Sequence, residues 1–184
     1  MSSRTVLRTA LALAIAGVSA AHATNGYVPH GYGIKSKGVA GAGAALPQDT
    51  LTIATNPAGL VAVGHRSDIG VELFVPDREA YIRGNAFGPD QRFDGNGTEY
   101  FLIPELGHSH LVCDDLAVGF ALFGNGGMNT DYDKNPFARY GSRGKSYMNL
   151  EQLFIAPAVA WEFSPGQTIG LALNLAYQRF EVKG

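Results

Sequence analysis

The sequence predicts an all-β fold, namely an antiparallel transmembrane β-barrel. Three observations lead to this prediction. The chain opens with an export signal, and no later apolar run is long enough for a membrane helix. Five segments alternate bulky apolar residues with small ones, as strands do when one face meets lipid. The connections between them alternate between short turns and long polar loops, which is the rule for outer-membrane barrels.

Residues 1–23 have the three parts of a cleavable signal peptide. Two arginines give a positive start, residues 9–18 form an apolar run, and Ala21-His22-Ala23 has the small-residue pattern of a cleavage site. The run is roughly half of the ~20 residues that a membrane helix needs. We therefore expect export, a mature chain that begins near Thr24, and a location in the cell outer membrane.

The composition excludes several classes of protein. The formal net charge is −2 and the mean hydropathy is zero, so there is no basic excess that would attract nucleic acid. The 24 glycines favour strands and tight turns over helices. Cys113 is the single cysteine, so no disulfide can form within the chain. Stability must come from a core, a membrane or a closed sheet.

The alternation places bulky and small side chains on opposite faces of each predicted strand. The five strands are residues 67–75, 99–112, 116–123, 152–163 and 168–177. Successive side chains of a strand point to opposite faces. In the last strand one face carries Ile169, Leu171, Leu173, Leu175 and Tyr177, and the other carries Gly170, Ala172, Asn174 and Ala176. The small face suits a lumen and the aliphatic face suits lipid. Residues 99–112 alternate least well, because Pro104 interrupts them.

Aromatic residues and loop lengths favour a barrel over a soluble sandwich, whose strands alternate too. Trp161 and Phe163 lie at one strand end and Tyr177 at another, as in an interfacial girdle. The connections comprise two tight turns, 113–115 and 164–167, and two long polar loops, 84–98 and 124–146. A soluble β-domain and a general porin remain alternatives, although a porin would carry more charge on its lumen face.

The chain resembles the FadL/TodX family of outer-membrane transporters for hydrophobic compounds. The most specific part is "GYGIKSKGVAGAGAALPQDTLTIATNPAGL", a glycine-spaced stretch that ends with Asn56, Pro57 and Ala58, the family's NPA signature, directly before the first strand. The resemblance implies that residues 24–66 are a hatch that plugs the barrel and that residues 67–184 are barrel strands. Small side chains would let the plug approach the wall closely, and Pro57 would fix the turn between them.

The resemblance also implies a path for the ligand. Long-chain fatty acids or aromatic hydrocarbons would bind inside the barrel and leave through a gap made by a kink in the third strand. Gly124, Asn125, Gly126 and Gly127 follow that strand and are the candidate kink, although they could simply begin the external loop. Movement of the hatch N-terminus, at Thr24, Asn25, Gly26 and Tyr27, would open the path. Phe123 and Phe154 are candidate ligand-lining residues.

Five strands are fewer than the ~8 that membrane barrels need to close. We therefore expect this sequence to be a fragment that contains the hatch and the first five strands of an incomplete barrel. Its partners would be a hydrophobic ligand, outer-membrane lipid, lipopolysaccharide and the barrel assembly machinery. Arg139, Arg143 and Lys145 are candidates for pairing with lipopolysaccharide phosphates. No cofactor is implied.

Other motifs give weaker functional signals. His108 and His110 share a strand face, but no third metal ligand follows, so no metal site is predicted. Residues 131–135 begin like a calcium loop, but Pro136 replaces the required glycine. A lipid-modifying acyl hydrolase is the competing function, with Ser109 beside a histidine as its only hint. Neighbouring strand residues point to opposite faces, so the chain is not expected to be an enzyme.

Overall fold

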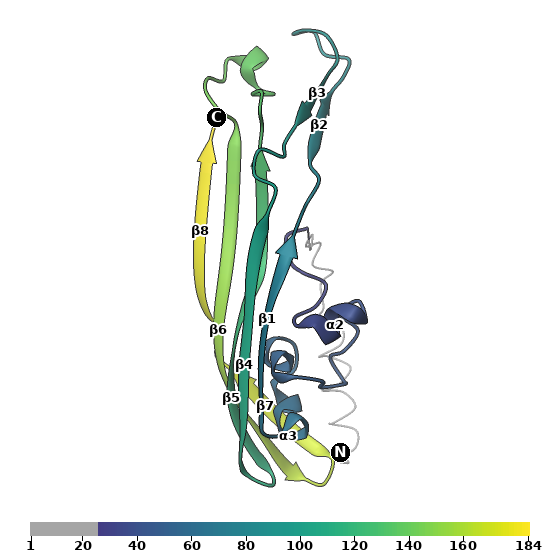
Figure 1. Ribbon diagram of the computed structural model, residues 1–184, viewed down its shortest axis with the longest axis vertical. Coiled ribbons are helices and arrows are strands. Elements are labelled where there is room, and N and C mark those ends of the chain that lie inside the picture. The colour runs from purple at the N-terminus through teal and green to yellow at the C-terminus, as the bar shows by residue number, and fades with distance from the viewer. Residues whose placement is uncertain (1–25) are drawn as a thin grey trace, which may run out of the picture.

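The computed structural model describes residues 26–184 (Figure 1). Long strands pair antiparallel in one large sheet, and short helices gather beside one of its faces. The predicted all-β, antiparallel fold is confirmed. The predicted signal peptide, together with Thr24 and Asn25 of the expected hatch N-terminus, lies outside the described residues.

The described residues form four short helices before the sheet and one after it begins. These are α2 (Ile34–Gly38), η1 (Thr50–Ala54), η2 (Pro57–Gly59), α3 (Leu60–Val63) and η3 (Ala138–Tyr140). The strands are β1 (Arg66–Phe74), β2 (Glu79–Ile82), β3 (Gln91–Asp94), β4 (Phe101–Cys113), β5 (Leu116–Asp131), β6 (Tyr147–Ser164), β7 (Gln167–Ala172) and β8 (Leu175–Lys183). Within this part of the chain, no helix has the length and apolarity needed to cross a membrane.

The large sheet has the order β1-β4-β5-β6-β7, and β8 pairs with the other half of β6. β2 and β3 form a separate hairpin. The tight β4–β5 and β6–β7 turns lie at one end of the sheet, and the β2–β3 hairpin and η3 lie at the other (Figure 1). The short and long connections are therefore segregated to opposite ends, as the sequence predicts.

The core lies between the small-residue face of the sheet and the N-terminal segment, residues 26–65. Ala117, Ala121, Ala156 and Ala160 are at most 1% exposed beneath the apolar residues of this segment, which include Leu51, Ile53 and Leu60. The opposite face is bare, as Ile69 at 88% and Leu171 at 72% exposed illustrate. Roughly 25 cal/mol per Å² is gained when such a face leaves water, so the face favours an apolar neighbour.

Two predicted loops were too long. β5 continues through the glycines to Asp131 and β6 starts at Tyr147, so the connection predicted as 124–146 shrinks to 132–146. The glycine-rich stretch forms a β-bulge, and the strand continues beyond it. Likewise, β3 lies inside the loop predicted as 84–98. The first strand begins at Arg66, which is within the usual uncertainty of strand ends.

The predicted strand 168–177 is two strands, because β6 carries Pro157 opposite the break. Pro157 has no N–H to donate to the ladder. The backbone N–H of Leu173 donates to the Pro157 carbonyl at 3.0 Å, and regular pairing resumes only at Leu175, opposite Ile155. A proline on one strand thus interrupts its neighbour.

Candidate functional site

The pairing between β4 and β5 stops partway along the sheet. It runs from the turn up to Glu105, which lies opposite Phe123. Beyond this pair, β4 continues to pair with β1 and β5 continues to pair with β6. Among the described residues, the two strands therefore share no regular ladder beyond Glu105 and Phe123, that is, toward the β2–β3 hairpin at the top of Figure 1. We call this interruption the ladder gap; its edges are residues 98–104 and 124–130.

A bulge in β5 marks the lower end of the ladder gap. Gly124 lies opposite Leu153 and Gly126 opposite Gln152, so Asn125 is the extra residue. Its side chain accepts a 2.7 Å hydrogen bond from the Tyr32 hydroxyl and donates one of 3.2 Å to Gln152. Bulges bend the strand that contains them. The predicted kink residues thus lie within a strand and form its bulge.

Backbone contacts close the ladder gap at its upper end. Gly97 N–H donates to the Asp131 carbonyl at 2.9 Å, and Asp131 N–H donates to the Gly95 carbonyl at 3.0 Å. The Thr98 hydroxyl and Lys145 bind the two carboxylate oxygens of Asp131 at 2.8 and 2.6 Å. The segment before β4 is therefore fastened to the end of β5, and the gap has a finite length.

The N-terminal segment reaches the ladder gap at Tyr27. The Tyr27 carbonyl accepts a 3.0 Å hydrogen bond from the backbone N–H of Gly127. A Cβ atom on Gly126 would overlap this carbonyl, and one on Gly124 would overlap the side chain of Ile103. The absence of side chains at these two glycines is what permits the close approach. The structure thus brings the expected hatch N-terminus and the candidate kink into contact.

Aromatic residues cluster just below the bulge. Tyr32 packs edge-on against Phe123, with ring centroids 4.8 Å apart, and Phe123 packs against Phe154 at 5.7 Å. Phe123 is 2% exposed, whereas Phe154 is half-buried. Both predicted lining residues therefore lie on the face that the N-terminal segment covers.

Lys37 of α2 ties the N-terminal segment to two wall strands. Its ammonium donates to Glu105 of β4 at 2.6 Å and also contacts Glu72 of β1. Glu105 is 7% exposed and accepts a further hydrogen bond from Gly33 N–H at 3.1 Å. Burial lowers the pKa of Lys37, but its hydrogen bonds to the carboxylates of Glu105 and Glu72 outweigh this effect and raise the pKa above its usual value. Lys37 thus stays charged in its partly buried position.

A second polar anchor lies at the start of η1. The backbone N–H and the hydroxyl of Thr50 donate to the Asp68 carboxylate of β1 at 3.0 and 2.8 Å. Thr50 fits against the wall because β4 has Gly107 there, where a Cβ would overlap its side chain. Asp49 caps η1 by accepting from Leu51 N–H at 3.1 Å.

The Asn56-Pro57-Ala58 turn forms the base of the N-terminal segment. Asn56 has a non-helical backbone and its amide donates to the Ala44 carbonyl at 2.9 Å, while Pro57 begins η2. The backbone of Pro57 and Ala58 lies directly on Gly170 of β7, where a Cβ would overlap the Ala58 nitrogen. The turn is therefore seated against the wall as well as joining it to the segment.

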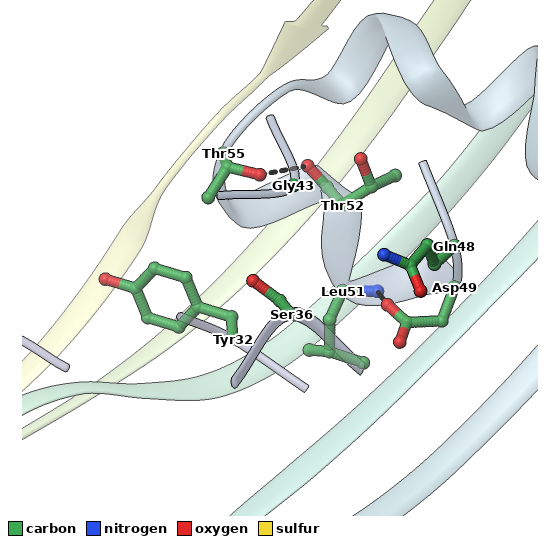
Figure 2. Close-up of a pocket in the computed structure, with 8 residues that line it drawn as sticks. All are labelled: Tyr32, Ser36, Gly43, Gln48, Asp49, Leu51, Thr52 and Thr55. Atoms are coloured by element: carbon green, nitrogen blue, oxygen red, sulfur yellow. Dashed lines mark hydrogen bonds between the residues drawn. The ribbon is translucent and has the colours of Figure 1, made fainter. Parts of the chain in front are cut away.

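A small polar cavity lies inside the N-terminal segment, between Tyr32, Ser36, Asp49 and Thr52 (Figure 2). Its volume of about 20 Å³ is enough for one water molecule and too small for an organic ligand. Burial and the nearby carboxylate of Asp68 raise the pKa of Asp49 at its edge. This cavity has no role as a binding site for apolar molecules.

The residues that suggested an acyl hydrolase or a metal site are not arranged for either one. Ser109 is fully buried, and its hydroxyl has no hydrogen-bond partner among the described residues. His108 lies on the other face, where its Nδ1 is 2.8 Å from the Ser67 hydroxyl. Within residues 26–184, no group of three potential metal ligands occurs. Of the loop cations, Arg139 donates to the Pro89 carbonyl at 3.0 Å and Lys145 pairs with Asp131.

Sequence reasoning missed Tyr32, Lys37, Glu72 and Glu105. The signal for the two glutamates is their position: each is a charged residue beside a glycine, Gly70 or Gly107, on the strand face that faces the N-terminal segment. A carboxylate there requires a partner. Nothing in the sequence identifies Lys37 rather than Lys35 as that partner.

A comparison with known protein families bears on this geometry. The family described as "Outer membrane protein transport protein (OMPP1/FadL/TodX)" has a sequence model that matches residues 14–184. Among curated proteins, none matches the chain.

Proposed function

This chain belongs to the OMPP1/FadL/TodX family of outer-membrane transport proteins, and we propose that it takes up small hydrophobic molecules such as long-chain fatty acids or aromatic hydrocarbons. A polar lipopolysaccharide surface obstructs apolar solutes, so their uptake needs a continuous apolar path through a protein. The bare aliphatic face of the sheet contacts membrane lipid, lipopolysaccharide surrounds the external loops, and the barrel assembly machinery inserts the full-length protein after removal of residues 1–23.

The contact between Tyr27 and the ladder gap is the observation that carries this proposal. The gap is the one stretch of the described wall where β4 and β5 can separate without breaking ladder hydrogen bonds. The N-terminal segment covers it from inside, through the Tyr27 carbonyl and through Tyr32 bound to Asn125. Release of this segment exposes Phe123 and Phe154 to the ligand, which then leaves sideways between β4 and β5 into the bilayer.

Uptake measurements in a strain that lacks the gene test the proposal. Production of the full-length protein should restore uptake of radiolabelled oleate or toluene. A Gly126→Val/Gly127→Val variant should lose most of this uptake, because a Cβ at Gly127 crowds the Leu150 carbonyl of β6 at 3.1 Å and the two branched side chains together distort the bulged strand that forms one edge of the ladder gap. Gly38→Ala is the control, since a Cβ at Gly38 meets nothing within 4 Å.

Two outcomes would overturn the proposal. One is uptake by the complemented strain that is no faster than in the deletion strain. The other is hydrolysis of an acyl ester by the purified full-length protein that disappears in Ser109→Ala, because this result would make the protein a lipid-modifying enzyme.

A further inference from the structure

We infer that Arg78, between β1 and β2, is a crossbar that limits how far β4 and β5 can separate, and that it thereby selects ligands by bulk. This inference rests on the proposed function. Arg78 donates from Nη1 to the Asn129 carbonyl at 3.0 Å and to the Asn129 side chain, and from Nη2 to the Thr98 carbonyl. Its guanidinium therefore joins the two edges of the ladder gap.

The position of Arg78 is fixed by further contacts. Its backbone N–H and Nε donate to the Asn96 side chain at 2.8 and 3.3 Å, and its guanidinium carbon lies 5.7 Å from the ring centre of Phe101. Only arginine offers several donors in a planar fork that can bind four acceptors at once and lie over a ring. A lysine in this place could keep the charge but could not span both edges.

Arg78 shortens the part of the gap that can open. On β5 the gap extends from Phe123 to Asp131, which is roughly 26 Å at ~3.3 Å per residue. Asn129 lies six residues above Phe123, so the crossbar leaves roughly 20 Å below it. It joins the edges two residues from Asp131 and so adds to the contacts that close the gap at that end. A linear alkyl chain needs little separation of the edges, whereas a rigid ring system needs more.

The test compares two apolar ligands of different bulk, hexadecane and pyrene. In Arg78→Met, which keeps the length of the side chain but cannot bridge, the ratio of pyrene to hexadecane uptake should rise by roughly threefold to tenfold, as expected for a modestly lowered barrier. Arg78→Lys should give a similar ratio. Arg83→Met is the matched control, because Arg83 lies over Tyr81 in the β2–β3 hairpin, away from the gap.

Folding of each variant is followed by its heat-modifiable migration in gels and by its amount in the outer membrane. An unchanged ratio in correctly folded Arg78→Met would overturn the inference, and so would an equal loss of both ligands, which would make Arg78 only a structural residue. If the wild-type protein takes up neither these two ligands nor oleate or toluene, the proposed function fails and the inference fails with it, whereas uptake of oleate or toluene without either of these two ligands would overturn the inference alone.

Discussion

The backbone N–H of Gly127 in β5 donates a 3.0 Å hydrogen bond to the carbonyl of Tyr27 in the N-terminal segment. This bond lies where β5 loses its pairing with β4. An amide–carbonyl hydrogen bond contributes about 1 kcal/mol net, so this contact is weak enough to open and close readily. The bond therefore places a weak contact where β4 and β5 are not paired.

Gly126→Ala should displace Tyr27 without disturbing the wall. The new methyl group would overlap the Tyr27 carbonyl, whereas β5 and β6 remain paired around it. We expect faster hydrogen exchange at the Gly127 amide, by about fivefold for a loss of about 1 kcal/mol, and faster uptake. Gly43→Ala is the control, because its nearest neighbour lies 3.8 Å away. Unchanged exchange at Gly127 would show that Tyr27 does not cover it.

The sequence predicts the strands well, because alternation of large and small residues reports directly on which face is covered. The sequence does not predict the breaks and bulges that depend on how a strand pairs with its neighbour. The break at Leu173 depends on Pro157, whose position opposite it follows only from the register of β6 with β7 and β8. The bulge at Asn125 is a similar case, since glycines can end a strand or bend it, and the pairing decides which.

Lys37→Met should release α2 from the wall. It leaves the carboxylates of Glu72 and Glu105 facing the same partly buried site with no cation between them. Removing one partner of a buried ion pair costs roughly 3–5 kcal/mol, and the exposure of these side chains places the effect at the lower end. Hydrogen exchange across residues 33–40 measures the release.

A triple variant, Lys37→Met/Glu72→Gln/Glu105→Gln, separates charge from packing. It removes the unbalanced charges together, so most of the protection lost in Lys37→Met should return. Equal exchange in the single and triple variants would mean that the lysine stem, and not its charge, holds α2.

High pH should weaken the same contact. The pKa of Lys37 is raised in the folded protein, so its contribution to stability is complete below the pKa of an unfolded lysine and is lost as the pH rises through the folded value. Docking of α2 should be constant near neutral pH and weaken above about pH 10.4. A spin label at Gly38→Cys, in a Cys113→Ser background, should become mobile in that range. The same label in Lys37→Met should show no such step.

Asp49→Asn should be neutral or stabilising at neutral pH, whereas Asp49→Ala should cost about 1 kcal/mol. Burial and the Asp68 carboxylate raise the pKa of Asp49, so its charged form costs stability once the pH exceeds that pKa. Asparagine keeps the acceptor for Leu51 N–H and removes the charge, whereas alanine removes both (Figure 2). Hydrogen exchange across residues 50–54 distinguishes the variants. A loss of protection in Asp49→Asn as large as in Asp49→Ala would mean that the charge itself is needed.

The candidate site is only partly readable from the sequence. The glycines next to Asn125 indicate an irregular strand, and a family signature marks the turn at Asn56. The contacts that hold the N-terminal segment join residues far apart in the chain, such as Lys37 with Glu105, and Arg78 with Asn129. These pairs depend on how the segment folds back on the sheet, and a single sequence does not show which distant residues come into contact.

Gly170→Ala should unseat the Asn56-Pro57-Ala58 turn from β7. A Cβ at Gly170 would overlap the Ala58 nitrogen, which belongs to the backbone and cannot swing away as a flexible side chain could. Because Gly170 lacks a positive φ, the substitution leaves β7 itself unstrained, and its pairing with Ala160 should persist. Hydrogen exchange should therefore rise at Gly59 and Leu60 and stay low in β7. Ala172→Gly, two residues along the same face, is the matched control and should leave the turn seated. If exchange rises equally in β7 and in the turn, the substitution has damaged the strand, and the turn has no separate seat on it.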